Sequence, residues 1–220
     1  MMNFFKKLFG KSSKVEPKEF TDEEYERDYV LKSKGLENVL GEMHEMVGHA
    51  LIPFSVGGTV DVYYFPDHLK GTGFATTELL KPDGTGPLPN RHGTYELVAF
   101  TKHEYNTNEN VQNSFNAMER RVCGLFTTIG LFSQQAVLNP NETCEVPVGK
   151  EEYCCVVFDL YEPDDKEFII GTKKHHLLLC LEVFRSEMEF ARANGSEKLF
   201  NKLKEAGHYP YSDLDRQPVA

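Results

Sequence analysis

Residues 153–184 read YCCVVFDLYEPDDKEFIIGTKKHHLLLCLEVF, and this stretch decides the fold class. Its hydrophobic residues gather in runs that predict three β-strands, at 153–161, 168–170 and 175–184. The run Leu177–Leu181 is apolar at every position, so neither face of its strand is suited to water. Such a pattern is typical of a strand inside a sheet. The stretch therefore predicts a sheet with Leu177–Leu181 in its central strand.

The chain before this stretch indicates further strands and one long helix. Segments rich in β-branched and aromatic residues predict strands at 51–56, 60–65, 74–80 and 95–102. Most loops between them are short and rich in glycine, which favours antiparallel neighbours. Between residues 110 and 135 the apolar residues follow a helical period instead. We expect the longest helix there, packed on the sheet.

Helices are also expected before the first strand. Thr21 and Glu24 have the spacing of a capping box, which predicts a helix that begins at this point. We expect Gly35 to interrupt this helix. A second helix should then run over 36–47 and stop at Gly48, since its apolar residues recur at helical spacing.

The chain ends in two short helices by the same criteria. Ser186 and Glu189 form a second capping-box pattern, and this helix should close at 194–195. Ser196 is expected to cap the last helix, which stops at Gly207. The order of elements predicts an α+β fold: a mixed, largely antiparallel β-sheet flanked by helices, with one long central helix and two C-terminal helices.

Charge divides the 220 residues into a basic leader and an acidic body. The whole chain carries a net charge of −10, whereas its first 18 residues, with five lysines and one glutamate, carry +4. We expect a flexible basic leader at 1–20, a single domain at 21–210 and a tail at 211–220. The acidic body excludes a nucleic-acid binder that relies on phosphate neutralisation. It favours a basic protein as the partner.

The cysteines and the hydropathy pattern predict a cytoplasmic protein. Five cysteines are an odd number without a C-x-x-C pair, which fits neither a disulfide framework nor a zinc knuckle. We expect buried thiols, with the adjacent Cys154 and Cys155 on opposite faces of their strand. No membrane span is predicted, and the leader is too short for stable anchoring at a membrane surface by itself.

The sequence offers little support for catalysis or for a bound metal. His44 and His49 stand five positions apart, about 140° around a helix, whereas the zinc motif H-E-x-x-H requires a spacing of four. The chain also lacks a G-x-S-x-G elbow and a complete phosphate-binding glycine loop. We therefore expect no metal, no cofactor and no enzyme activity.

The candidate binding residues are Asp61, Tyr63 and Glu96, which lie in two predicted strands. Alternation places Asp61 and Tyr63 on the same face. If the strands are near neighbours, Asp61 and Glu96 can share a polar patch with Arg120 or Arg121. Such a patch has two interpretations, a structural ion pair or an exposed recognition site for a protein, and the sequence leaves both open.

Several short motifs occur in order along residues 36–207, namely HALI at 49–52, VDVYYFP at 60–66, YELV at 95–98, LNPNET at 138–143 and EMEFARANG at 187–195. This ordered set resembles the bacterial members of the Suppressor of Fused family. The resemblance implies a mixed sheet flanked by helices that binds a protein without catalysis. It also implies a role as an immunity protein, which neutralises a toxin domain by binding it.

Three classes of function follow from these observations. The leading hypothesis is a cytosolic protein-binding module, most simply a Suppressor of Fused-like immunity protein whose acidic body attracts a basic toxin domain. The first alternative is a hydrolase or transferase whose cysteine and histidine residues meet only in the folded chain. The second alternative is a homodimeric scaffold with a self-complementary apolar patch.

Overall fold

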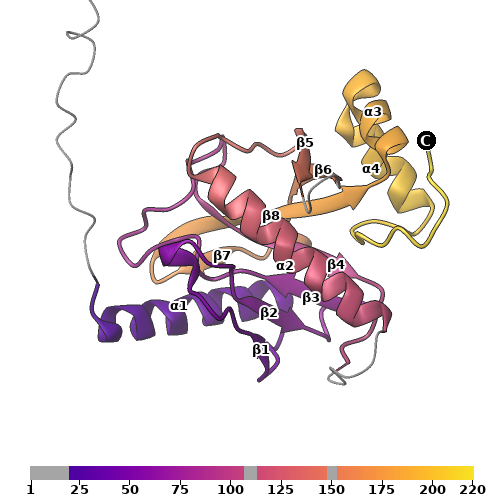
Figure 1. The fold of residues 1–220 in the computed structure, drawn as a ribbon. Helices are drawn as coiled ribbons and strands as arrows, with labels where there is room; N and C mark the ends of the chain where they lie inside the picture. The colour runs from indigo at the N-terminus through magenta and orange to yellow at the C-terminus, as the bar shows by residue number, and fades with distance from the viewer. Residues whose placement is uncertain (1–19, 107–112, 148–152) are drawn as a thin grey trace, which may run out of the picture.

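The computed structural model describes residues 20–106, 113–147 and 153–220, and β8 (Lys173–Val183) is its central strand. β8 pairs in parallel with β4 (Tyr95–Thr101) on one side and antiparallel with β6 (Tyr153–Leu160) on the other. Every residue from Leu177 to Val183 is buried. The prediction that this apolar run forms a central strand is confirmed (Figure 1).

The described strands form one eight-stranded sheet in which all neighbours except β4 and β8 are antiparallel. Its order is β1-β2-β3-β4-β8-β6-β5, and β7 pairs with the beginning of β8. The remaining strands are β1 (Val47–Gly48), β2 (Val62–Phe65), β3 (Thr72–Ala75), β5 (Thr143–Pro147) and β7 (Phe168–Ile170).

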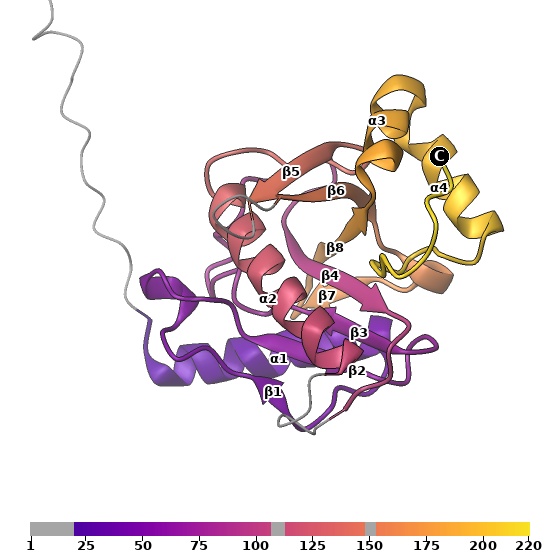
Figure 2. The same ribbon diagram turned by 45° about the vertical axis from the view of Figure 1, so that its right-hand side comes forward.

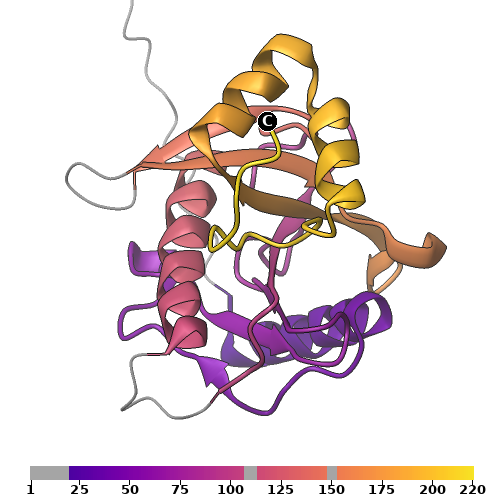
Figure 3. The ribbon, with the colours of Figure 1, turned by 90° about the vertical axis from the view of Figure 1, so that its right-hand side faces the viewer.

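Helices cover both faces of the sheet, as Figure 3 shows. The long α2 packs on one face, and the other three pack on the opposite face. Figure 2 shows α3 and α4 together near β5 and β6, and α1 behind β2 and β3. The predicted α+β fold is thus confirmed. The helices are α1 (Asp22–Leu40), α2 (Ser114–Ser133), α3 (Arg185–Asn194) and α4 (Ser196–Glu205).

Strand alternation divides the core into two layers. Cys155 packs in the layer below α1, α3 and α4, whereas Cys154 packs below α2, so the expected opposite orientation of these neighbours is confirmed. The five cysteines are all free thiols, of which Cys154, Cys155 and Cys180 are buried and the other two are partly buried.

The first helix differs from the prediction. α1 passes through Gly35 without a break and ends at Leu40, so the expected second helix over 36–47 does not form. A Cβ at Gly35 would lie 2.6 Å from the carbonyl oxygen of Ile169, so the missing side chain lets β7 approach the helix. The helix ends where Gly41 adopts a φ of 84°, a conformation that other residues seldom take.

Other boundaries were also predicted incorrectly. Residues 51–56 form no strand, and β5 was not anticipated, because a short edge strand carries a weak periodic signal. The N-terminal pair of α3 is Phe184 and Glu187, with the Phe184 N–H donating to Glu187 Oε2, and not Ser186 and Glu189. The Ser196 hydroxyl donates to the Asn141 carbonyl oxygen and does not cap α4.

The structure describes the C-terminal end of the chain but not residues 1–19. The expected leader lies outside the described residues, apart from Phe20. At the other end, residues 211–220 pack on the domain, with Ser212 and Asp213 buried against the sheet. Among the described helices, none has the length and apolar character needed to cross a membrane.

Candidate functional site

A cavity of about 470 Å³ lies beside α1, and Tyr63, one of the predicted binding residues, lines it. It is bounded by α1, residues 54–57, β2, the segment after β3 and the end of α2. We call it the α1 cavity. The residues that matter for its chemistry are Tyr25, Asp28, Tyr29, Lys32, Tyr63 and Glu78.

The floor of the α1 cavity is built around a buried lysine. The Lys32 side chain is only 3% exposed, and its ammonium group lies 2.6 Å from Asp28 Oδ2 and 3.9 Å from Glu96 Oε1. Its Nζ also donates to the carbonyl oxygens of Thr77 and Leu80. A buried cation is tolerated when it is paired and hydrogen-bonded in this way. Lys32 therefore ties α1 to the segment that follows β3.

Glu96 also holds the segment that follows β3, and it has no solvent-accessible surface. Its carboxylate accepts hydrogen bonds from the Thr76 hydroxyl at 2.6 Å and from the Leu80 N–H at 3.0 Å. Burial raises the pKa of Glu96, and the charge of Lys32 opposes this rise. Because a partner cannot touch Glu96 in this structure, Glu96 can influence binding only through the residues that it holds in place.

Asp61 lies just before β2 and joins the cavity through Glu78. Asp61 Oδ2 lies 2.8 Å from His49 Nδ1, and Oδ1 accepts a hydrogen bond from the Ala50 N–H. The Asp61 N–H donates to Glu78 Oε2 at 2.7 Å. Burial raises the pKa of Glu78, and the negative charges of Asp61 and Glu96 add to this rise. Asp61 and Glu96 thus both contact the segment 78–80, Asp61 through Glu78 and Glu96 through the Leu79 and Leu80 N–H groups.

The hypothesis that Arg121 joins a polar patch with Asp61 and Glu96 is wrong, whereas the same hypothesis for Arg120 stays a prediction. Arg121 Nε donates to Glu182 Oε2 at 2.6 Å. This ion pair lies on the α2 face of the sheet, whereas Glu96 faces α1, because alternate residues of β4 and β8 point to opposite faces. The cation beside Glu96 is Lys32, and no periodic pattern in α1 could have identified it.

Aromatic side chains form the upper walls of the α1 cavity. Tyr63 is 5% exposed, and its ring centroid lies 5.8 Å from that of Tyr29. Tyr25 and Tyr29 are 47% and 38% exposed, and Leu131 at the end of α2 is 40% exposed. The exposed residues Tyr25, Tyr29 and Leu131, two tyrosines and one leucine, form what we call the aromatic rim. Exposed aromatic groups around a pocket are typical of surfaces that anchor a protein partner.

The pKa shifts of the cysteines run opposite to those of a catalytic nucleophile. Burial raises the pKa of all five thiols, and that of Cys154 rises to about 12. The thiols of Cys123, Cys144 and Cys180 donate to backbone carbonyl oxygens. A reactive cysteine requires a lowered pKa, which favours the thiolate.

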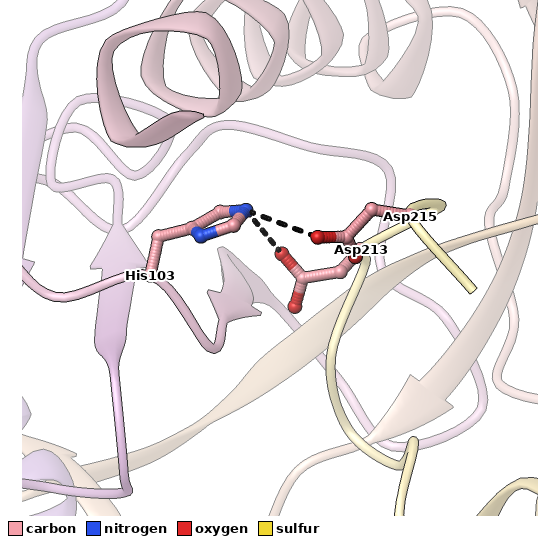
Figure 4. A group of neighbouring side chains, drawn as sticks. All are labelled: His103, Asp213 and Asp215. Atoms are coloured by element: carbon pink, nitrogen blue, oxygen red, sulfur yellow. Dashed lines mark ion pairs between the residues drawn. The ribbon is translucent and has the colours of Figure 1, made fainter. Parts of the chain in front are cut away.

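His103, Asp213 and Asp215 form a separate cluster where the C-terminal tail meets the end of β4 (Figure 4). Within the described residues, their ligand-type atoms are the ones that lie close enough together for a metal ion, within 4.8 Å. His103 Nε2 lies 3.4 Å from Asp213 Oδ1 and 3.9 Å from Asp215 Oδ2. Both Asp213 oxygens already accept hydrogen bonds, from the Thr101 hydroxyl and the Lys102 N–H. These contacts fasten the tail to β4 without requiring an ion.

Comparisons with known proteins identify a similar fold. Neither a family model nor a curated protein matches the chain. Among solved structures, a chain of the Sufu-Fu complex crystal structure matches with a TM-score of 0.56 and 16% sequence identity. The match covers 87% of this chain and 91% of that chain. The protein therefore has a fold like that of Suppressor of Fused.

Proposed function

We propose that this chain is a protein-binding module without catalytic activity, and that its partner binds at the aromatic rim of the α1 cavity. The observation that carries the proposal is the combination of exposed Tyr25, Tyr29 and Leu131 with a polar floor of paired charges. An apolar or aromatic anchor next to buried polar groups is the usual arrangement of an interface hot spot. The similar fold in a structure described as the Sufu-Fu complex supports the same class of function.

The partner that fits best is a basic toxin domain, so the chain would act in the cytoplasm as a bacterial Suppressor of Fused-like immunity protein. Two observations support this narrower proposal. The motifs along residues 36–207 resemble the bacterial family, and the net charge of −10 speeds encounter with a basic protein. In this proposal the partner lies beside Asp61 and Tyr63. The buried Glu96 contributes indirectly, because it holds the segment after β3 in place.

A capture experiment tests the proposal. The tagged protein is incubated with lysate from the native host, and bound proteins are identified by mass spectrometry. We expect one basic protein to be retained by the wild type and released at high salt, because salt screens attraction between exposed charges. The variant Tyr25→Ala should lose it. Tyr153→Ala is the matched control, since Tyr153 is 56% exposed and lies on β6, away from the cavity.

The same experiment separates the alternatives. Retention of the bait alone, together with a dimer in sedimentation equilibrium, would replace the proposal with the homodimeric scaffold. A partner that remains bound to Tyr25→Ala as strongly as to the wild type would place the interface elsewhere on the molecule.

A further inference from the structure

The α1 cavity has walls that suit a cation. Three tyrosines line it: Tyr25 and Tyr29 on α1, and Tyr63 on β2. The face of an aromatic ring carries partial negative charge and attracts a cation within about 6 Å of the ring centre. The Tyr29 and Tyr63 rings lie next to each other, with centroids 5.8 Å apart, so they form one continuous aromatic wall.

The charged residues around the cavity also favour the binding of a cation. Asp28 and Glu78 line the cavity, and Asp61 and Glu96 contact its floor. Lys32 is the one buried cation among the described lining residues, and its ammonium group is already engaged by Asp28 and two carbonyl oxygens. Lys81 also lines the cavity, but its side chain is exposed. The lining thus holds two carboxylates and two lysines, but Lys32 is matched by Asp28 and Lys81 is exposed, so Glu78 is the lining carboxylate that offers its charge to an incoming cation.

This inference rests on the proposed protein-binding function and names the group that is recognised. We propose that the α1 cavity receives an arginine side chain of the protein partner, held between the tyrosines and the carboxylate of Glu78. Arginine fits better than lysine because its planar guanidinium stacks on aromatic rings, binds a carboxylate with two hydrogen bonds and is less strongly hydrated. A cavity of about 470 Å³ has ample room for it.

A peptide pair tests the proposal directly. The blocked tripeptide acetyl-Leu-Arg-Leu-amide is titrated into the ¹⁵N-labelled full chain, and amide resonances are followed by NMR. The probe with citrulline in place of arginine has nearly the same shape but no charge. We expect the arginine peptide to shift the amides of Tyr29, Thr77 and Glu78 in a saturable manner. The citrulline peptide should bind about tenfold more weakly, the expected loss for a charge-assisted hydrogen bond.

Two variants assign the effect to the cavity. Glu78→Gln should weaken the arginine peptide about tenfold, because it removes the charge but keeps an oxygen that can accept from Asp61 N–H. Glu205→Gln makes the same change at an exposed position on α4 and should have no effect. If Glu78→Gln does not fold, as judged by circular dichroism, Tyr25→Ala replaces it, with Tyr153→Ala as its control.

The inference is overturned if the two peptides bind equally, if Glu78→Gln binds like the wild type, or if the Kd exceeds about 10 mM. These outcomes are distinct from failure of the proposed function. A partner captured equally by the wild type and by Glu78→Gln would preserve the binding module and reject the arginine. Failure to capture any partner would reject the module whatever the peptides do.

Discussion

Replacing Lys32 by methionine should destabilise the protein strongly, although the new side chain is apolar and similar in length. Lys32→Met removes the cation from a site where Asp28 and Glu96 lie within 4 Å and where two carbonyl oxygens accept from Nζ. The side chain of Glu96 has no exposed surface, so water cannot replace the lost partner. Breaking a buried ion pair on one side typically costs about 3–5 kcal/mol. We expect a loss of this size in the free energy of unfolding at neutral pH.

The loss should depend on pH in a defined direction. An unfolded glutamate titrates near a pKa of about 4.3. In the folded protein burial raises the pKa of Glu96, and the charge of Lys32 offsets only part of this rise. Removing Lys32 therefore raises the folded pKa further. Between the unfolded and folded pKa values the folded protein binds more protons, so the free energy of unfolding falls as the pH rises. The deficit of Lys32→Met should thus be larger at about pH 8 than at about pH 5.

Urea denaturation followed by circular dichroism measures these effects, with a double-mutant cycle to isolate the pair. Glu96→Gln combined with Lys32→Met should recover part of the lost stability, because the fully buried charge of Glu96 is then removed together with its partner, whereas Asp28 still loses Lys32. Lys198→Met, at an exposed position of α4, is the control and should change stability by less than about 0.5 kcal/mol. A Lys32→Met variant within about 1 kcal/mol of the wild type at both pH values would refute this account of the buried pair.

Three further predictions concern other parts of the fold. Glu187→Gln should lower the free energy of unfolding by about 3 kcal/mol at neutral pH, because it weakens a buried pair with Arg216. Burial alone would raise the pKa of Glu187, but its hydrogen bonds outweigh burial and lower the pKa. The stability difference between wild type and variant in urea titrations should therefore narrow below about pH 4.3, and a difference that stays constant would contradict this. Gly35→Ala should lower the melting temperature, although alanine favours helices by about 1 kcal/mol, since its Cβ would lie 2.6 Å from the Ile169 carbonyl oxygen; a higher melting temperature would disprove the close approach. Ellman's reagent should leave the three buried thiols unmodified in the native protein and react with them in urea; they belong to Cys154, Cys155 and Cys180. Rapid reaction of these thiols in the native protein would instead support a cysteine nucleophile.

The central strand and the long helix could be predicted because their signals are local. Leu177–Leu181 is apolar on both faces, and α2 keeps a helical period over its length, so each pattern identifies its element without knowledge of the neighbours. Gly35 illustrates the opposite case. Glycine is normally unfavourable inside a helix, yet here the helix continues because β7 packs against that position. Tertiary packing outweighed the local preference.

The candidate site shows the same division between local and long-range information. Asp61 and Glu96 were recognisable as carboxylates within or next to strands, and Tyr63 by alternation. Their shared contact with residues 78–80 and the contact of Glu96 with Lys32 were not recognisable, since Lys32 stands 64 positions before Glu96 in the chain. The expected Arg121 instead pairs with Glu182 on the α2 face of the sheet. Sequence periodicity assigns a residue to a face, but it does not tell which helix covers that face.

The sequence by itself determined the fold class, the acidic charge of the body and the strand that lies at the centre of the sheet. These properties follow from composition and from periodicity over a few residues, which survive in any packing of the elements. Only the tertiary structure decided that α1 would cover Glu96, that Lys32 would be buried there and that three tyrosines would line one cavity. Those contacts join residues far apart in the chain, so they exist only once the sheet and its helices have assembled.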